Sequence, residues 1–256
     1  MEPYKKKVLS SKTEKPPDDY RKIVPDDEVE CVWVGAGVVP YKLCDFNYDC
    51  NNCAFDKVIR GGHDLSPAPV NIKGFKLYPF LFYNTCHMWA RVEENAHVRI
   101  GIDDFGQGLI GKPQDLCLPI MGEKLSNESI RIKGRGINIS LTPPVEGHVI
   151  EFNERLIQQP SMLNEYPYEL GWIIVVRPSR LSKHLKRLHY GHSAQQWYYA
   201  EATRLANLIS EEIGMPLSEV GITIQDGGNP DFDLLDKMDQ RSVQRIIEQL
   251  LCNCPS

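Results

Sequence analysis

The amino-acid sequence predicts a mainly β protein with added helices, in which a small sandwich or barrel of short strands is followed by a helical extension. Short alternating apolar runs, separated by turn residues, occupy the middle of the 256-residue chain, as in small all-β domains. Apolar residues at helical spacing recur across residues 193–212 and 239–251. Apolar residues make up 42% of the chain, so it can bury a substantial core.

Residues 1–28 are predicted to be a flexible tail, because they are rich in Lys, Asp, Glu and Pro and show no apolar periodicity. The basic start has no apolar segment behind it, so no secretory signal is expected. The chain has no run of about 18 apolar residues and is therefore not expected to span a membrane. The cytoplasm is the expected location.

The charge pattern argues against a nucleic-acid-binding protein. The net charge is −5, and acidic and basic residues are mixed along the chain. One local basic cluster is interpreted as the solvated start of a helix; it comprises Arg177, Arg180, Lys183, Lys186 and Arg187. Nucleic acid is therefore not an expected partner.

Residues 29–64 are predicted to be a cysteine-rich metal-binding segment. Four of the eight cysteines lie within 23 residues, in the spacing C-x12-C-x5-C-x2-C, and these are Cys31, Cys44, Cys50 and Cys53. Four thiolates complete a tetrahedral site, so structural zinc is the first expectation. An iron-sulfur cluster also needs four thiolates and is the alternative. Four reduced cysteines without a metal are the third interpretation, because ligand identity alone seldom fixes the metal.

A helix and a connector are expected after the cysteines. The residues from Ala54 to Arg60 can form a helix, which the following Gly-Gly pair ends. Residues 65–83 contain several Pro and Gly residues and are predicted to be a connector. Its aromatic end, Tyr78 to Tyr83, is expected to pack on the next domain, because so much exposed aromatic surface would be a liability.

Residues 84–178 are predicted to form the central β domain. Strands are expected between Ala90 and Ile102 and at Leu116, Ile130, Ile137 and Val149. A short helix is expected next to the first of these strands, with Asp103 as its cap. The apolar runs on either side of Gly134-Arg135-Gly136 predict a hairpin, because glycine readily adopts the positive φ that a tight turn needs.

The domain is expected to end with a helical turn at residues 154–158 and a buried strand at residues 171–176. Residues 179–256 are then predicted to form the helical extension. One helix is expected from Ser193, as N-cap, to Glu212, with Gly214 as its stop. A second is expected at residues 239–251. Their apolar faces are expected to be core, or else a surface through which the chain forms homo-oligomers.

At the central domain the sequence resembles a known family, the H protein of the glycine cleavage system. The resemblance covers about residues 84–178 and rests on separated motifs in matching order and spacing. These are His87 to Val92, Arg99 to Gly111, Pro119 followed by Gly122, Pro144 to Gly147, Asn153, Pro160 and Tyr168 to Trp172. It implies a lipoyl-domain-like barrel-sandwich hybrid of two small sheets. It also implies a hairpin that presents a lipoylated lysine, whose arm shuttles an aminomethyl group and electrons between enzymes.

The hairpin departs from the family at the place of that lysine. Counted back from Pro144, the lysine position falls on Gly136, which carries no amine. A gap placed elsewhere brings Lys133 near the tip. Modified lysines of the family lie among acidic and small residues, whereas Lys133 is followed by Gly134-Arg135. Lipoate is therefore not expected, and modification of Lys133 is kept as an alternative.

A histidine and three further cysteines carry no assigned function. His87 is expected to be partly buried beside Trp89, and Cys86 to be a ligand or a thiol. The C-terminal pair Cys252 and Cys254 is interpreted as mobile thiols or as tail cysteines without a function.

The sequence contains no nucleophile elbow, no phosphate-binding loop and no zinc-protease helix. Its acidic pair Asp103-Asp104 and the run Asp226 to Asn229 are interpreted as a helix cap and a turn. The chain is therefore expected not to be an enzyme.

The expected function is that of an H-protein-like adaptor or assembly protein that is not lipoylated. Its expected partners are proteins of a multi-subunit redox or one-carbon enzyme, an expectation that rests on the family resemblance. Two alternatives remain, a lipoyl-type carrier modified on Lys133 and an iron-sulfur electron-transfer subunit.

Overall fold

The computed structural model describes residues 29–59, 68–93, 96–127, 129–214 and 232–252. The predicted flexible tail at residues 1–28 and the turn at Asp226 to Asn229 lie outside the described residues. The strands are β1 Val70–Ile72, β2 Phe75–Leu77, β3 Phe82–Tyr83, β4 Met88–Val92, β5 Val98–Ile102, β6 Pro113–Cys117, β7 Ile130–Gly134, β8 Ile137–Leu141, β9 Gly147–Phe152 and β10 Ile174–Pro178. The helices are α1 Val32–Gly35, α2 Ala54–Ile59, α3 Asp104–Ile110, α4 Glu154–Gln158, α5 Met162–Glu165, α6 Leu181–Leu185, α7 Gly191–Ile213, α8 Asp233–Lys237 and α9 Gln240–Ile247, which continues as the π-helical turn η3 Glu248–Cys252.

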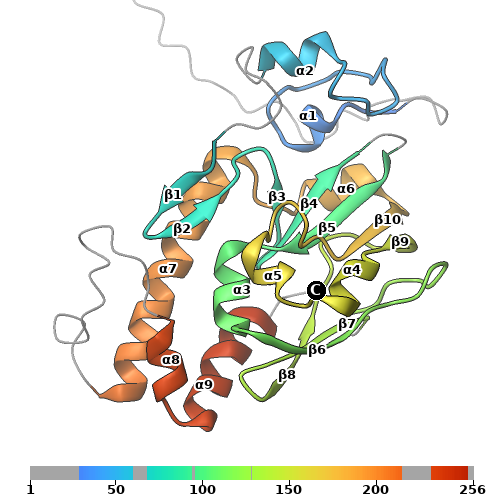
Figure 1. Cartoon of the computed structure of the whole chain (residues 1–256). Helices are drawn as coiled ribbons and strands as arrows, with labels where there is room; N and C mark the ends of the chain where they lie inside the picture. Colours follow the sequence, from blue (N-terminus) through green and yellow to red (C-terminus); the bar gives the residue numbers. More distant parts are fainter. Residues whose placement is uncertain (1–28, 60–67, 94–95, 128, 215–231, 253–256) are drawn as a thin grey trace, which may run out of the picture.

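The described strands form three antiparallel sheets. The largest has the order β3-β4-β5-β10-β9, a second has the order β6-β7-β8, and β1 and β2 form a separate hairpin (Figure 1). Buried side chains from all three belong to one hydrophobic core, together with side chains of α7 and α9. The fold is therefore mainly β with added helices, as predicted. The two larger sheets stay separate, and the described strands close no barrel.

The local signals of the central domain predicted its elements well. Asp103 caps α3 as expected, because its Oδ1 accepts a hydrogen bond from the amide of Gly106 at 2.7 Å. Helix α4 has the predicted bounds, and strands β4 to β9 lie where alternating apolar residues placed them. Strand β10 begins later than predicted, at Ile174, because residues 166–172 form a turn before it.

The start of α7 corrects one prediction. The N-cap is Tyr190 and not Ser193, since the backbone of Tyr190 is extended (φ −147°, ψ 146°) and the helix begins at the next residue. Ser193 lies in the first turn, where its Oγ accepts a hydrogen bond from the amide of Tyr190 at 3.0 Å. Gly214 ends the helix with φ +66°, as predicted.

The aromatic end of the predicted connector packs into the core as expected. Phe82 and Tyr83 are buried and pair with β4. Tyr83 also exchanges two backbone hydrogen bonds with His189, at 2.9 and 2.8 Å, just before α7. The sequence analysis did not predict the hairpin of β1 and β2 within this connector.

The apolar face of α7 is buried within the chain itself, which is the first of its two predicted uses. The buried residues are Ala194, Tyr198, Ala202, Leu205, Ala206 and Ile209. Figure 1 shows α7 running beside the sheets towards α8 and α9. Glu212 near the end of α7 accepts a hydrogen bond from Arg245 of α9 at 2.8 Å, so the two helices are joined by charge as well as by packing.

The cysteine-rich segment attaches to the rest of the chain through Trp33. Its indole ring lies edge-on to Tyr190, at 5.5 Å between ring centroids, and to Phe80, at 6.3 Å. The indole nitrogen donates a hydrogen bond to the buried carboxylate of Asp56 at 2.8 Å. The aromatic contacts therefore seat this segment on the domain (Figure 1).

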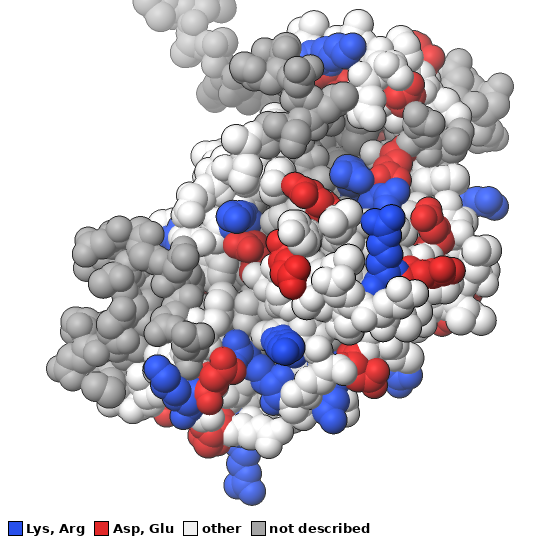
Figure 2. Space-filling view, in the orientation of Figure 1, with Lys and Arg blue, Asp and Glu red and all other residues white. Residues whose placement is uncertain are grey.

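On the face drawn in Figure 2, acidic and basic side chains are interspersed, in keeping with the mixed charges of the sequence. Within the described residues, the structure contains no helix that is both long enough and apolar enough to cross a membrane.

We predict that the substitution Gly101→Ala destabilises the domain. A Cβ at residue 101 would lie 2.5 Å from the buried ring of Trp89. That ring is held in place, because its nitrogen donates to the carbonyls of Ile102 at 3.1 Å and Pro167 at 3.0 Å. The free energy of unfolding should fall by about 1–3 kcal/mol, measured by denaturant titration. The exposed strand variant Asn138→Ser serves as the control and should stay within about 0.5 kcal/mol of wild type. Equal stability of Gly101→Ala and wild type would contradict the tight contact.

Candidate functional site

The hairpin of β7 and β8 is closed by a two-residue turn. Lys133 pairs with Asn138 and Gly134 with Ile137, which leaves Arg135 and Gly136 at the tip. Both tip residues have positive φ, +50° for Arg135 and +77° for Gly136, as a turn of type I′ requires. The predicted turn is confirmed, but Arg135 and not Gly134 takes the first left-handed position.

The positive φ of Arg135 is unfavourable for a residue with a side chain. Contacts of the Arg135 side chain offset this conformational cost. Its Nε donates to the carbonyl of Leu109 at 3.0 Å, and one terminal nitrogen donates to the carbonyl of Gly108 at 3.2 Å. These carbonyls belong to the last turn of α3, where a cation is favoured. A further ion pair joins Arg135 to Asp236 of α8. The tip is therefore bound to α3 and α8.

The second tip residue, Gly136, is exposed and has one contact with the C-terminal helices. The side-chain nitrogen of the exposed Gln240 in α9 donates to the carbonyl of Gly136 at 3.4 Å, and a Cβ on Gly136 would meet that nitrogen at 3.0 Å. Beside the tip, a Cβ on Gly108 would lie 2.1 Å from the ring of Phe232. Phe232 thus lies directly against the backbone of α3. The position where the family resemblance places a lysine is an exposed glycine beside α9.

Lys133 lies two residues before the turn and is exposed on β7. Its neighbours across the sheet are Asn138 on β8 and Asp115 on β6. The alternative lysine is therefore part of a paired strand and not of the hairpin tip.

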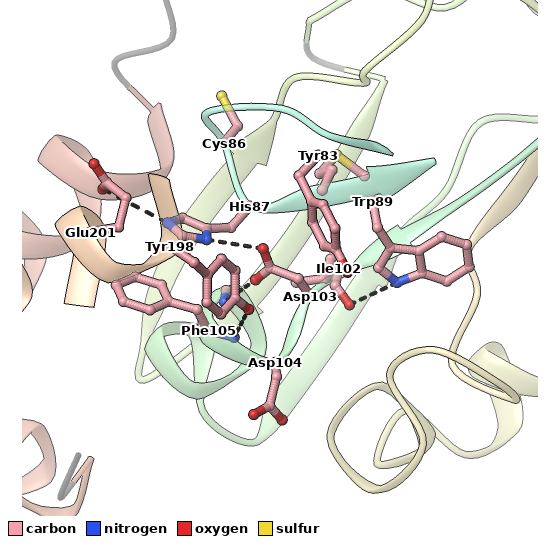
Figure 3. Close-up of polar contacts among 12 residues, drawn as sticks. Tyr83, Cys86, His87, Trp89, Ile102, Asp103, Asp104, Phe105, Tyr198 and Glu201 are labelled. Carbon is pink, nitrogen blue, oxygen red and sulfur yellow. Dashed lines mark hydrogen bonds and ion pairs between the residues drawn. The ribbon is translucent and has the colours of Figure 1, made fainter. Parts of the chain in front are cut away.

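A buried histidine joins the sheet to α3 and α7 (Figure 3). His87 is completely buried before β4, and its Nδ1 lies 3.0 Å from Oδ2 of Asp103. Its Nε2 faces Oε2 of Glu201 on α7 at 3.8 Å. The imidazole ring stacks on Phe105, with 4.1 Å between ring centroids, and packs against Trp197 at 4.8 Å.

The expectation of a partly buried His87 is wrong, and the two carboxylates supply the reason. Burial by itself lowers the pKa of His87, but the nearby charges of Asp103 and Glu201 and the hydrogen bond to Asp103 outweigh it, so the net pKa is raised. Burial alone would raise the pKa of Glu201. The nearby His87 and Arg204 lower it by more than that, so the net pKa of Glu201 is below its ordinary value. A charged imidazole can therefore stay inside the core.

Glu201 carries no motif that marks it in the sequence as a partner of His87. Its only signal is its place in α7, three residues after buried Tyr198 and four before buried Leu205, on the inward face of the helix. An acidic residue on such a face needs a buried partner. The identity of that partner depends on the tertiary fold.

Cys86 is disulfide-bonded, so it is neither a free thiol nor a free ligand. The predicted thiol pair of Cys252 and Cys254 lies outside the side chains that the structure describes.

The structure brings the four cysteines of the N-terminal segment around one cavity. Cys31, Cys44, Cys50 and Cys53 all line it, and all four are free of disulfides. Burial raises the pKa of Cys31. In the part of the chain that the structure describes, no three or more His, Cys, Asp or Glu residues already form a group that could hold a metal ion. The predicted metal site therefore stays a prediction.

Comparison with known proteins matches the central domain. The family model for the glycine cleavage H-protein matches residues 81–200. A probable glycine cleavage system H protein of Thermococcus gammatolerans is 33% identical over 121 residues, which cover 46% of this chain and 90% of that protein. The glycine cleavage system H protein of Anoxybacillus flavithermus is 41% identical over 105 residues, which cover 40% of this chain and 82% of that protein. A solved glycine cleavage system H protein of Mycobacterium marinum aligns with a TM-score of 0.42 and 21% identity, over 48% of this chain and 99% of that one.

We predict that Glu201→Gln weakens the fold in a pH-dependent way. Because the pKa of His87 is raised, its contribution is complete below the ordinary histidine value of 6.5 and is lost as pH rises through the folded value. Because the pKa of Glu201 is lowered, its contribution is complete above the ordinary value of 4.5 and is lost as pH falls through the folded value. The loss of stability should thus be largest between these two pH values, at about 1–3 kcal/mol.

The measurement is urea unfolding of Glu201→Gln and wild type at pH values between 4.5 and 6.5 and again well above 6.5. The control is Glu211→Gln, which removes an exposed carboxylate from the same helix. A loss of stability that is equal at all pH values, or equal in the control, would contradict the buried ion pair.

Proposed function

This chain belongs to the glycine cleavage H-protein family, and we propose that it serves in this family as a docking or assembly protein, not as a lipoyl carrier and not as an enzyme. The family match covers the two larger sheets and the start of α7, up to residue 200. The helices α8 and α9 that contact the hairpin tip lie beyond it.

The observation that carries the proposal is a hairpin tip that holds no amine and whose arginine is bound within the chain. A lipoyl arm needs an exposed amine that an attaching enzyme can reach and from which the arm can swing. Gly136 is exposed but offers no amine, and Arg135 is held by α3 and α8. The tip is thus used for contacts within the chain, which supports a role without a prosthetic arm.

Lys133 is a poor substitute for the missing lysine. Its backbone is fixed in β7 between two partner strands, whereas the tip is two residues away. Its neighbours along the strand, Arg131 and Arg135, are cationic, although Asp115 lies opposite it on β6. The family resemblance implies acidic and small residues around a modified lysine.

A pocket on the other side of the domain is the contact surface that we assign to docking. It has a volume of about 440 Å³, and its lining is mixed. Apolar and polar side chains line it in equal number: Met121, Phe152, Leu170 and Trp172, and Glu151, Asn153, Glu154 and Arg155. Met121 is 65% exposed and Leu170 is 39% exposed. The pocket is preformed, because the side-chain nitrogen of Asn153 donates to the carbonyls of Leu170 and Trp172, both at 2.7 Å. A preformed pocket lowers the cost of ordering the surface when a partner binds.

The charges around the pocket indicate the chemistry of the partner. The segments 120–124, 151–155 and 165–172 supply or flank the lining residues and hold five carboxylates against two cations. An apolar side chain flanked by basic residues would therefore complement this surface. We assign it to a protein subunit with that chemistry, and propose that the subunit belongs to a redox or one-carbon enzyme complex.

The absence of lipoylation is testable by intact mass. The full chain is incubated with a lipoyl ligase, lipoate and ATP, beside the Anoxybacillus flavithermus H protein as positive control. Wild type should stay unmodified, because its hairpin tip carries no amine. A lipoyl adduct on wild type that disappears in Lys133→Arg would establish the carrier alternative and overturn the proposal.

The docking pocket is tested with matched charge insertions. Leu170→Asp places a carboxylate in the pocket, and Val58→Asp places one at a 74% exposed apolar residue of α2, outside it. A subunit that co-purifies with the tagged full chain in a fixed ratio should be lost with Leu170→Asp and retained with Val58→Asp. High salt should also release the subunit from the wild-type chain, because salt screens the attraction between the charged rim of the pocket and the subunit. Retention of the subunit by Leu170→Asp would contradict the assignment.

A further inference from the structure

We propose that Cys31, Cys44, Cys50 and Cys53 bind one zinc ion that holds the N-terminal segment in its fold. This site shares no residue with the hairpin or with the docking pocket. The zinc proposal can therefore be tested independently of the proposed function. The ligands of the ion would all be thiolates from a single stretch of chain.

Backbone hydrogen bonds bring the first two cysteines together. The amide of Cys31 donates to the carbonyl of Lys42 at 2.9 Å, and the amide of Cys44 donates to the carbonyl of Val29 at 2.7 Å. Glu30 and Leu43 form an antiparallel bridge between these bonds. Two cysteines that are 13 positions apart therefore lie on paired backbone.

A tight turn presents the other two cysteines. The amide of Cys53 donates to the carbonyl of Cys50 at 3.2 Å, which closes the C-x2-C spacing into a turn. One ligand pair from paired backbone and one from such a turn is a frequent construction of tetrahedral zinc sites.

The surroundings of the cavity suit a thiolate-bound ion. The amide of Tyr48 donates a hydrogen bond to Sγ of Cys44 at 3.2 Å, which stabilises a thiolate and orients it. The cavity that the four cysteines line leaves about 10 Å³ free, close to the space of one water-sized sphere. A space of this size would accommodate a single ion.

The segment needs such a crosslink. Its own small core contains three buried apolar residues, Cys31, Trp33 and Val34, and so small a core gives little stability by itself. A structural ion would supply the missing stability. Because the described residues do not already form a closed ligand group, binding requires the thiols to turn inward around the cavity.

The test is metal analysis of the full chain purified without oxygen. The expected product is colourless and holds one zinc per chain. Cys50→Ser and Cys53→Ser should lose most of this zinc, and the exchange of zinc for cobalt should give a thiolate-to-cobalt absorption band that these variants lack. The matched control is Cys117→Ser, because Cys117 is an exposed free cysteine on β6 and its loss should leave the zinc content unchanged.

A second readout does not depend on metal content. Removal of zinc by a chelator should make residues 29–59 sensitive to protease while the sheets remain resistant. A brown protein with iron and inorganic sulfide would overturn the proposal, as would a zinc-free protein with four reactive thiols in this segment. An equal loss of zinc in Cys117→Ser would overturn the assignment of the ligands.

Discussion

The buried pairing of His87 with two carboxylates is the interaction on which the arrangement of the chain depends. Asp103 belongs to the start of α3 and Glu201 to α7, so one imidazole joins the large sheet to a helix outside it. Because unpaired charges are costly to bury, this contact favours the observed placement of α7. Helix α7 in turn contacts α9 through Glu212 and Arg245, and α9 carries Gln240 to the hairpin tip.

These contacts extend to the tip of the β7–β8 hairpin, where the family resemblance would place the lipoyl arm. A hairpin with a free tip suits a carrier, since an arm can swing only from an exposed position. Here the tip arginine caps the carbonyl end of α3, and its strained backbone is offset by those bonds. The same turn chemistry that makes a tight hairpin thus makes a contact point for the C-terminal helices. This use of the tip supports the proposed docking role.

The cysteine-rich segment has good contacts with the rest of the domain but little core of its own. Its apolar contacts with the domain, centred on Trp33, seat it in place, but its internal core is small. Four thiols around one small cavity are an unusual way to line a protein interior unless they share a ligand. The aromatic contacts therefore explain where the segment lies, and a bound ion would explain why it folds.

The sequence by itself determined the elements whose signals are local. Asp103 as a helix cap, the bounds of α4, the strands of the hairpin and the stop at Gly214 follow from neighbouring residues, because caps and apolar periodicity act over a few positions. The glycine at the expected lysine position was also visible from the register of the hairpin. Only the tertiary structure decided that His87 is completely buried, that it faces Glu201 and that Gln240 contacts Gly136. These contacts join residues that are about a hundred positions apart, and no local pattern encodes such a meeting.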